Sequence, residues 1–184
     1  MQLETEHLIL RPWQESDLEW VYEYFSDPAV AIPSGLPTHT SMEDSRRMLT
    51  DVLSAPNTFA LYLKSEGHVI GDIVLMIGQA SFEKLPDTEA ELGYWIGKPY
   101  WGQGLTTEAA RKMIRYAFEE LKLEKLWSGY FDGNDASRRV QEKCGFRYCY
   151  TKREFYWEDL KAIRTEHFSC LTREEYLSGM SSPT

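Results

Sequence analysis

Hydrophobic and polar residues follow two different periods along this chain, and the changes of period divide it into elements. Segments rich in β-forming residues, several of them strictly alternating, predict strands at residues 3–10, 59–64, 69–77, 89–96, 126–131, 146–157 and 163–171. Apolar residues at helical spacing predict helices at residues 16–27, 40–53, 106–121 and 134–143. The first two open with the capping signals Ser16-x-x-Glu19 and Thr40-x-x-Glu43. Elements in this order indicate an α+β protein with one crossover helix lying on a mixed sheet.

The composition is that of a single globular domain. The chain has 184 residues, near the usual size of one domain, and 42% of them are hydrophobic. No internal repeat or linker divides it, so we expect one domain at residues 1–177 and a flexible, serine-containing tail at residues 178–184. A formal net charge of −9 argues against nucleic acid as a partner, because phosphate binding needs clustered positive charge, and it fits a cationic acceptor better.

The spacing of cysteines and histidines and the character of the N-terminal residues indicate the cellular compartment and whether a metal is bound. The three cysteines have no metal-ligand spacing and the four histidines are scattered, so we expect free thiols and no metal site. The first eleven residues mix acidic, apolar and basic side chains, unlike a signal peptide, and no apolar run is long enough to span a bilayer. These features predict a cytoplasmic protein, monomeric or homodimeric, without a membrane partner.

The segment between residues 93 and 109 carries the strongest indication of chemistry. A predicted strand leads into a turn with Gly102 and Gly104, and this turn opens the best predicted helix. Backbone N–H groups at such a turn, together with the helix N-terminus, suit a pyrophosphate. A Walker loop is absent, and a dinucleotide fingerprint needs a third glycine where Thr107 stands. The segment is therefore either a tight turn without a ligand or a coenzyme A site.

Three stretches of the sequence form a recognisable set. The turn reads Pro99-Tyr-Trp-Gly102-Gln103-Gly104, a later helix begins Asn134-Asp-Ala-Ser137 and ends Lys143-Cys-Gly145-Phe146, and the chain opens with Thr5-Glu-His-Leu-Ile-Leu-Arg-Pro12. Over residues 3–171 the chain resembles the GNAT acetyltransferases, in particular the branch of ribosomal-protein alanine N-acetyltransferases. The family signature is Gln/Arg-x-x-Gly-x-Gly/Ala. Pro99 at its first position removes one side-chain contact and leaves the amide cradle intact.

This resemblance implies a fold and a cosubstrate. The fold is a mixed, mostly antiparallel sheet flanked by helices and splayed open between the strands near residues 95 and 130, with acetyl-CoA in the gap. The strand edge near Ile96 is expected to pair with the pantetheine, and Asn134 and Ser137 to approach the pantetheine or the sulfur. The pyrophosphate is expected to bind the backbone amides of Gly102, Gln103, Gly104, Leu105 and Thr106.

Three side chains are candidate catalytic groups. Glu91 lies on the face that the alternation predicts to be polar, and it matches the branch's Glu-Leu/Ile-Gly-Tyr-Trp pattern. It is the candidate base, with a solvated strand carboxylate as the alternative. Ser137 or Asn134 is the candidate proton donor to the departing thiolate, with Tyr130 and Tyr148 as alternatives, although Asn134 also suits a helix N-cap. A backbone amide on the strand before the turn is expected to meet the oxyanion.

The sequence thus predicts an N-acetyltransferase that transfers the acetyl group of acetyl-CoA to a primary amine by direct attack in a ternary complex. The amine is either the N-terminus of a protein or peptide, or a small molecule. Two alternatives stay open, a non-catalytic protein that binds or senses acyl-CoA on the same fold, and a nucleotide-binding module that uses Gly102 and Gly104. Neither the acceptor nor the role of residues 157–164 follows from the sequence.

Overall fold

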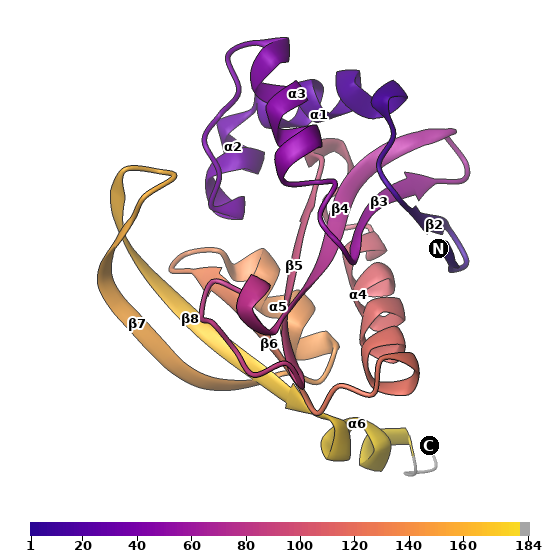
Figure 1. The fold of residues 1–184 in the computed structure, drawn as a ribbon, viewed down its shortest axis with the longest axis vertical. Coiled ribbons are helices and arrows are strands. Elements are labelled where there is room, and N and C mark those ends of the chain that lie inside the picture. Colours follow the sequence, from indigo (N-terminus) through magenta and orange to yellow (C-terminus); the bar gives the residue numbers. More distant parts are fainter. Residues whose placement is uncertain (181–184) are drawn as a thin grey trace.

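A computed structural model describes residues 1–180, and within them eight strands form one sheet in the order β1-β2-β3-β4-β5-β6-β8-β7 (Figure 1). Six of the seven strand pairings among these residues are antiparallel, and only β5 and β6 run parallel. The strands are β1 (Leu3–Glu4), β2 (Leu8–Arg11), β3 (Thr58–Leu63), β4 (His68–Ile77), β5 (Glu89–Ile96), β6 (Lys125–Phe131), β7 (Arg147–Trp157) and β8 (Ala162–Thr172).

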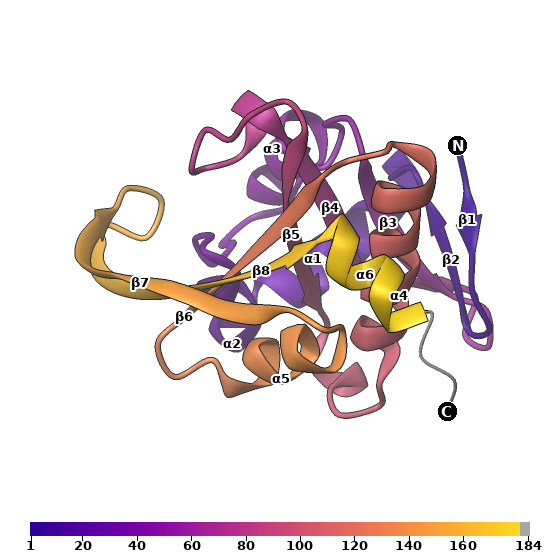
Figure 2. The ribbon, with the colours of Figure 1, turned by 90° about the horizontal axis from the view of Figure 1, so that it is seen from below.

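Helices cover both faces of this sheet. The N-terminal helices α1 (Leu18–Phe25), α2 (Pro28–Ala31) and α3 (Met42–Asp51) lie together on one face. On the other face lie α4 (Leu105–Arg115) and α5 (Asp135–Lys143), and α6 (Arg173–Met180) follows β8 (Figure 2). The predicted α+β class and its mixed, mostly antiparallel sheet are confirmed.

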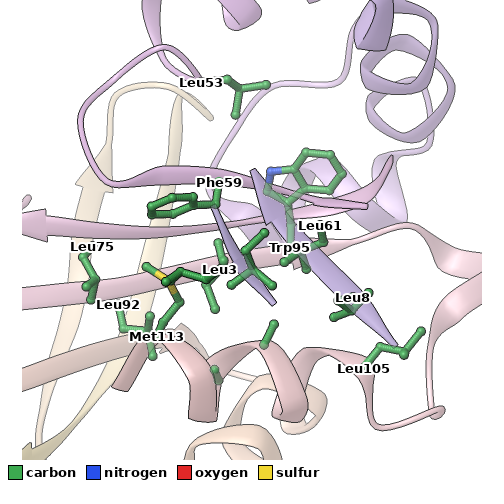
Figure 3. Close-up of a cluster of buried hydrophobic side chains, with 14 of the residues drawn as sticks. Leu3, Leu8, Leu53, Phe59, Leu61, Leu75, Leu92, Trp95, Leu105 and Met113 are labelled. Atoms are coloured by element: carbon green, nitrogen blue, oxygen red, sulfur yellow. The ribbon is translucent and has the colours of Figure 1, made fainter. Parts of the chain in front are cut away.

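The two faces of β5 pack into different parts of the core. Leu92 meets the α4 side, where Met113 and Leu105 of α4 lie beneath the sheet (Figure 3). Trp95 lies three residues further along β5, so its side chain points to the other face. There it packs against Phe25 of α1, with ring centroids 4.7 Å apart. Successive side chains of a strand point to opposite faces, so β5 lies between the two helical layers.

Local details at three helix ends differ from the predictions. The turn before α1 is capped by Gln14 and Asp17 and not by Ser16, since the Gln14 N–H donates to Asp17 Oδ2 at 2.9 Å. Asp17 also accepts two hydrogen bonds of 2.8 Å from Arg11. The capping box of α3 is formed by Ser41 and Asp44, one residue beyond the predicted Thr40–Glu43 pair. A π-helical turn, Tyr116–Glu120, completes the segment that was predicted as one α-helix.

A helix at the C-terminal end overlaps the predicted tail. Helix α6 continues to Met180, so the first three residues of the predicted tail are helical. The rest of that predicted tail, residues 181–184, lies outside the described residues. Among residues 1–180, none of the helices has the length and apolar character needed to cross a membrane.

Candidate active site

The sheet opens between β5 and β6. The two strands pair only through residues 89–91 of β5 and 125–127 of β6 and then separate. The backbone of β5 bonds to β4 through Gly97 N–H, which donates to the Ile70 carbonyl at 2.8 Å. By strand alternation, the peptide groups of Leu92, Tyr94 and Ile96 therefore face the opening. The splayed geometry expected from the resemblance is present.

A glycine turn lies at the end of β5, where the opening meets helix α4. Gly102 and Gly104 have φ of 74° and 82°, the left-handed region that favours glycine. A Cβ placed at either residue would meet nothing within 4 Å, so both face open space. Gly104 is the N-cap of α4, and no side chain caps that end. The first amides of α4 are therefore available to an anion.

On the α4–α5 side of the opening, Tyr94 joins β5 to the start of α5. Its hydroxyl lies 3.0 Å from Ser137 Oγ and donates to the Ser137 carbonyl at 3.1 Å. Asn134 caps α5, since its Oδ1 accepts a hydrogen bond of 3.2 Å from the Ser137 N–H. Burial raises the pKa of Tyr94 to about 12, so the phenol stays protonated at neutral pH. Two hydroxyl groups thus lie together at one side of the opening.

Glu91 lies on the opposite face of β5. Only 6% of the residue is exposed, so the alternative interpretation of Glu91 as a solvated strand carboxylate is wrong. Its carboxylate accepts a hydrogen bond of 3.2 Å from the Phe82 N–H. Burial raises the pKa of Glu91 to about 7, and the nearby charge of Glu83 also raises it. The hydrogen bond from Phe82 and the charge of Lys152 act in the opposite direction. A carboxyl group that titrates near neutral pH is suited to accept and release a proton.

Comparisons with known proteins agree with this geometry. Residues 7–147 match the family model of the acetyltransferase (GNAT) domain. The chain belongs to the GNAT acetyltransferase family. It is 30% identical over 180 residues to the uncharacterized N-acetyltransferase YoaA of Bacillus subtilis (strain 168), covering 94% of this chain and 98% of that protein. YdaF of the same organism, named provisionally as a ribosomal N-acetyltransferase, is 32% identical and covers 77% of this chain and 79% of its own length.

A solved structure supports the same assignment. The GNAT acetyltransferase from Bacillus anthracis superposes with a TM-score of 0.82 at 26% identity, and the match covers 95% of this chain and 100% of that one. GNAT enzymes use acetyl-CoA as a rule, and the protein is an acetyltransferase. The predicted resemblance and enzyme class are thereby confirmed.

The GNAT fold gathers the predicted site residues around one opening. Residues 96 and 102–106 lie on the connection from β5 to α4, and Asn134 and Ser137 lie across the opening at the start of α5. The alternative donor Tyr148 is exposed and bonds to Thr151 at 2.9 Å, away from Ser137. Tyr130 packs on His167 with ring centroids 5.1 Å apart.

Sequence reasoning missed two residues that lie near the opening. Tyr94 is two residues from Leu92, so both side chains point to the α4–α5 face of β5. The alternation that predicted Leu92 in the core therefore also directs the Tyr94 hydroxyl toward α5. Glu166 is a buried carboxylate in β8, only 8% exposed. An acidic residue among the alternating apolar residues of that predicted strand was the available signal.

Proposed function

We propose that this GNAT protein transfers the acetyl group of acetyl-CoA to a primary amine by direct attack within a ternary complex. The observation that carries the proposal is the opening between β5 and β6, which has a glycine turn at its end, Ser137 on one face and buried Glu91 on the other. A thioester held in that opening would be attacked by an amine on the Glu91 face of the sheet. Its sulfur would receive a proton on the Ser137 face.

The cosubstrate would be held mainly by backbone groups. The amides of Gly102, Gln103, Gly104, Leu105 and Thr106 would receive the pyrophosphate, because the left-handed glycines leave the turn open and α4 adds the positive end of its dipole. The edge of β5 at Ile96, which β6 does not pair, would bind the pantetheine, although Trp101 Nε1 already donates to the Ile96 carbonyl at 2.9 Å. Residues Asn134 and Ser137 would lie beside the sulfur.

The chemical step requires a neutral amine, a stabilised oxyanion and a proton for sulfur. Glu91 would take a proton from the ammonium, and the nitrogen lone pair would then attack the thioester carbonyl. A backbone N–H of β5 near Ile96 would stabilise the oxyanion. As the carbonyl re-forms, the C–S bond breaks with its electron pair on sulfur, and Ser137, hydrogen-bonded to Tyr94, would give its proton to sulfur. The nitrogen would lose its second proton as the amide forms, and this proton would return to Ser137 through solvent.

The proposal is tested by titrating released thiol after mixing the protein and acetyl-CoA with n-butylamine, 1,4-diaminobutane or a short peptide with an N-terminal alanine. We expect thiol release above the amine-free background with at least one acceptor. Tight acetyl-CoA binding without amine-dependent release from any of them would favour the acyl-CoA-sensing alternative. Competition by ADP as strong as that by coenzyme A would favour the nucleotide-binding alternative.

Gly104→Val is expected to raise the dissociation constant of acetyl-CoA tenfold or more, about 1.4 kcal/mol. The residue has a φ of 82°, which a β-branched side chain disfavours, and the new methyl groups would fill the space in front of the amides. Calorimetry measures the affinity. Gly67→Val, at a φ of 75° in the β3–β4 turn, is the matched control for backbone strain and should leave the affinity unchanged. An unchanged affinity in folded Gly104→Val would place the pyrophosphate elsewhere.

Ser137→Ala is expected to lower turnover by about tenfold while acetyl-CoA affinity stays within twofold. The effect is smaller than that of a typical general acid because a thiolate with a pKa near ~8.5 leaves without much assistance. Steady-state thiol release measures it, with Ser65→Ala in the exposed β3–β4 turn as control. Full turnover in Ser137→Ala would mean that another group or water protonates the sulfur.

A further inference from the structure

Glu166 is a buried carboxylate that the proposed reaction does not yet use. The residue is 8% exposed, yet within residues 1–180 its side chain has no hydrogen bond and no ion pair. Its oxygens are not among the fully buried atoms without a partner, so the carboxylate keeps some access to solvent and to a ligand. Holding a carboxylate in a mostly buried place without a hydrogen bond is costly, which a bound ligand would offset. The carboxylate lies over Gly129 of β6, where a Cβ would come within 3.0 Å of Glu166 Cδ and collide with Oε1. A side chain at residue 129 would therefore force the Glu166 carboxylate to move.

Glu166 and Glu91 lie on the same face of the sheet, on either side of the opening. Glu91 pairs with Trp127 of β6, and Glu166 pairs with Phe131, four residues further along β6. Four residues is an even number of strand steps, so the two carboxylates point to the same side. Both therefore face the side from which the amine would reach the thioester.

Carboxylates outnumber cations around Glu166, whose register partner on β7 is Lys152. Lys152 of β7 bonds to Glu83 at 3.0 Å, and Arg164 of β8 lies over the Phe131 ring, 5.7 Å from its centroid. Burial raises the pKa of Glu166 to about 8, Glu91 and Glu83 raise it further, and Lys152 lowers it. Burial, Glu83, Glu166 and Glu91 raise the pKa of Tyr150. Among the described residues, this part of the sheet thus holds the carboxylates of Glu83, Glu91 and Glu166 with Lys152 and Arg164 as its cations, and Lys152 is already bonded to Glu83.

Aromatic side chains form a wall beside the two carboxylates. Trp157, near the tip of the β7–β8 hairpin, donates a hydrogen bond of 2.7 Å to the Gly35 carbonyl beyond α2. Its ring packs on Phe131 and Phe82, with centroid distances of 5.0 and 5.3 Å. The curved hairpin in Figures 1 and 2 thus meets the N-terminal helices on this face. Aromatic rings beside a buried carboxylate suit an organic cation.

We propose that Glu166 binds the ammonium group of the acceptor amine and holds it between Glu166 and Glu91 on the face of the sheet that Trp157 encloses. This inference rests on the proposed function and adds a residue that selects cationic acceptors. One N–H of the ammonium would bond to Glu166, and another would be directed to Glu91, which removes that proton. The neutral amine would remain bonded to Glu166 while its lone pair attacks the thioester. Glu166 is in this sense a substrate-binding residue, and Glu91 the base.

The test uses n-butylamine as the probe and compares the wild type with Glu166→Gln, Glu166→Asp and the control Glu158→Gln, which lies in the exposed turn of the same hairpin. Each protein is loaded with coenzyme A, which cannot react, and titrated with n-butylamine by calorimetry at pH 7 and 8. We expect Glu166→Gln to weaken n-butylamine binding tenfold or more, Glu166→Asp to weaken it less, and Glu158→Gln to leave it within twofold.

Two further readouts separate binding from a merely structural role. With acetyl-CoA, Glu166→Gln should raise KM for n-butylamine tenfold or more and change kcat by less than threefold, with coenzyme A affinity unchanged. Wild-type binding of n-butylamine should strengthen from pH 6 to 8 as Glu166 ionises, and that of Glu166→Gln should depend less on pH.

The outcomes distinguish this inference from the proposed function. Unchanged n-butylamine affinity in folded Glu166→Gln, or no binding by the wild type, would overturn the role of Glu166. Binding that depends on Glu166 without acetyl transfer to any amine would support the ammonium site and contradict the proposed transferase reaction.

Discussion

Glu91→Gln is expected to lower turnover on the order of 10²-fold at neutral pH, the usual effect of removing a general base. An acceptor amine with a pKa near ~10 is almost wholly protonated at pH 7, and reversing this costs about 4 kcal/mol. Glutamine keeps the shape of the side chain and can still accept the Phe82 N–H, but it cannot take a proton. Because Glu91 is buried with a pKa of about 7, a large fraction of it is ionised when the reaction runs near neutral pH.

The pH dependence of the Glu91→Gln defect distinguishes a base from a positioning group. As the pH rises, more amine is already neutral, so the loss of turnover should shrink while acetyl-CoA affinity stays nearly constant. Initial rates between pH 6.5 and 9.5 measure this, with Glu158→Gln as control. A defect of equal size at every pH would indicate that Glu91 positions the acceptor, and wild-type turnover would remove it from the mechanism.

Elements whose signals are local were predictable from the sequence. Strand β5 was predicted at its observed bounds because Glu89 to Ile96 alternate and glycines follow. The cap at Asn134 and the turn at Gly102 and Gly104 depend on neighbouring residues alone, and both are present. The first strand was less accurate, since residues 3–10 form two short strands that pair with each other through a turn.

Features that depend on distant segments were not predictable in the same way. The alternation of β5 correctly separated Glu91 from Leu92, but it did not show that a second layer covers the Glu91 face. That layer includes Phe82, nine residues before Glu91, and the β7–β8 hairpin, more than fifty residues after it. The partnership of Tyr94 with Ser137 likewise joins residues 43 positions apart. The sequence therefore names candidate catalytic residues, but their burial and charge state required the fold.

Three buried carboxyl groups should make the protein lose stability as the pH rises. Burial raises the pKa of Asp72 to about 7, although Trp13 donates to it at 2.7 Å, and it raises the pKa of Glu91 to about 7 and of Glu166 to about 8. In the unfolded chain these groups titrate near pH ~4. Between those values the folded protein binds more protons than the unfolded chain, so the free energy of unfolding falls with increasing pH. The stabilisation is full below about pH 4 and is lost as the pH passes through 7 to 8.

The expected slope is large enough to measure by urea unfolding of the ligand-free protein at pH 5, 6, 7 and 8. Each carboxyl group that titrates only in the unfolded chain lowers the free energy of unfolding by up to about 1.4 kcal/mol per pH unit. The pKa of His7, raised by Glu108, acts in the same direction, whereas His39, whose pKa burial lowers, opposes it near pH 6. Glu166→Gln should flatten the slope and be more stable than the wild type at pH 8, because it removes an unpaired buried charge. A free energy of unfolding that stays constant or rises from pH 5 to 8 would contradict the protonated state of these groups. A stabilised Glu166→Gln that also loses ammonium affinity would show that the fold retains this carboxylate for binding and not for stability.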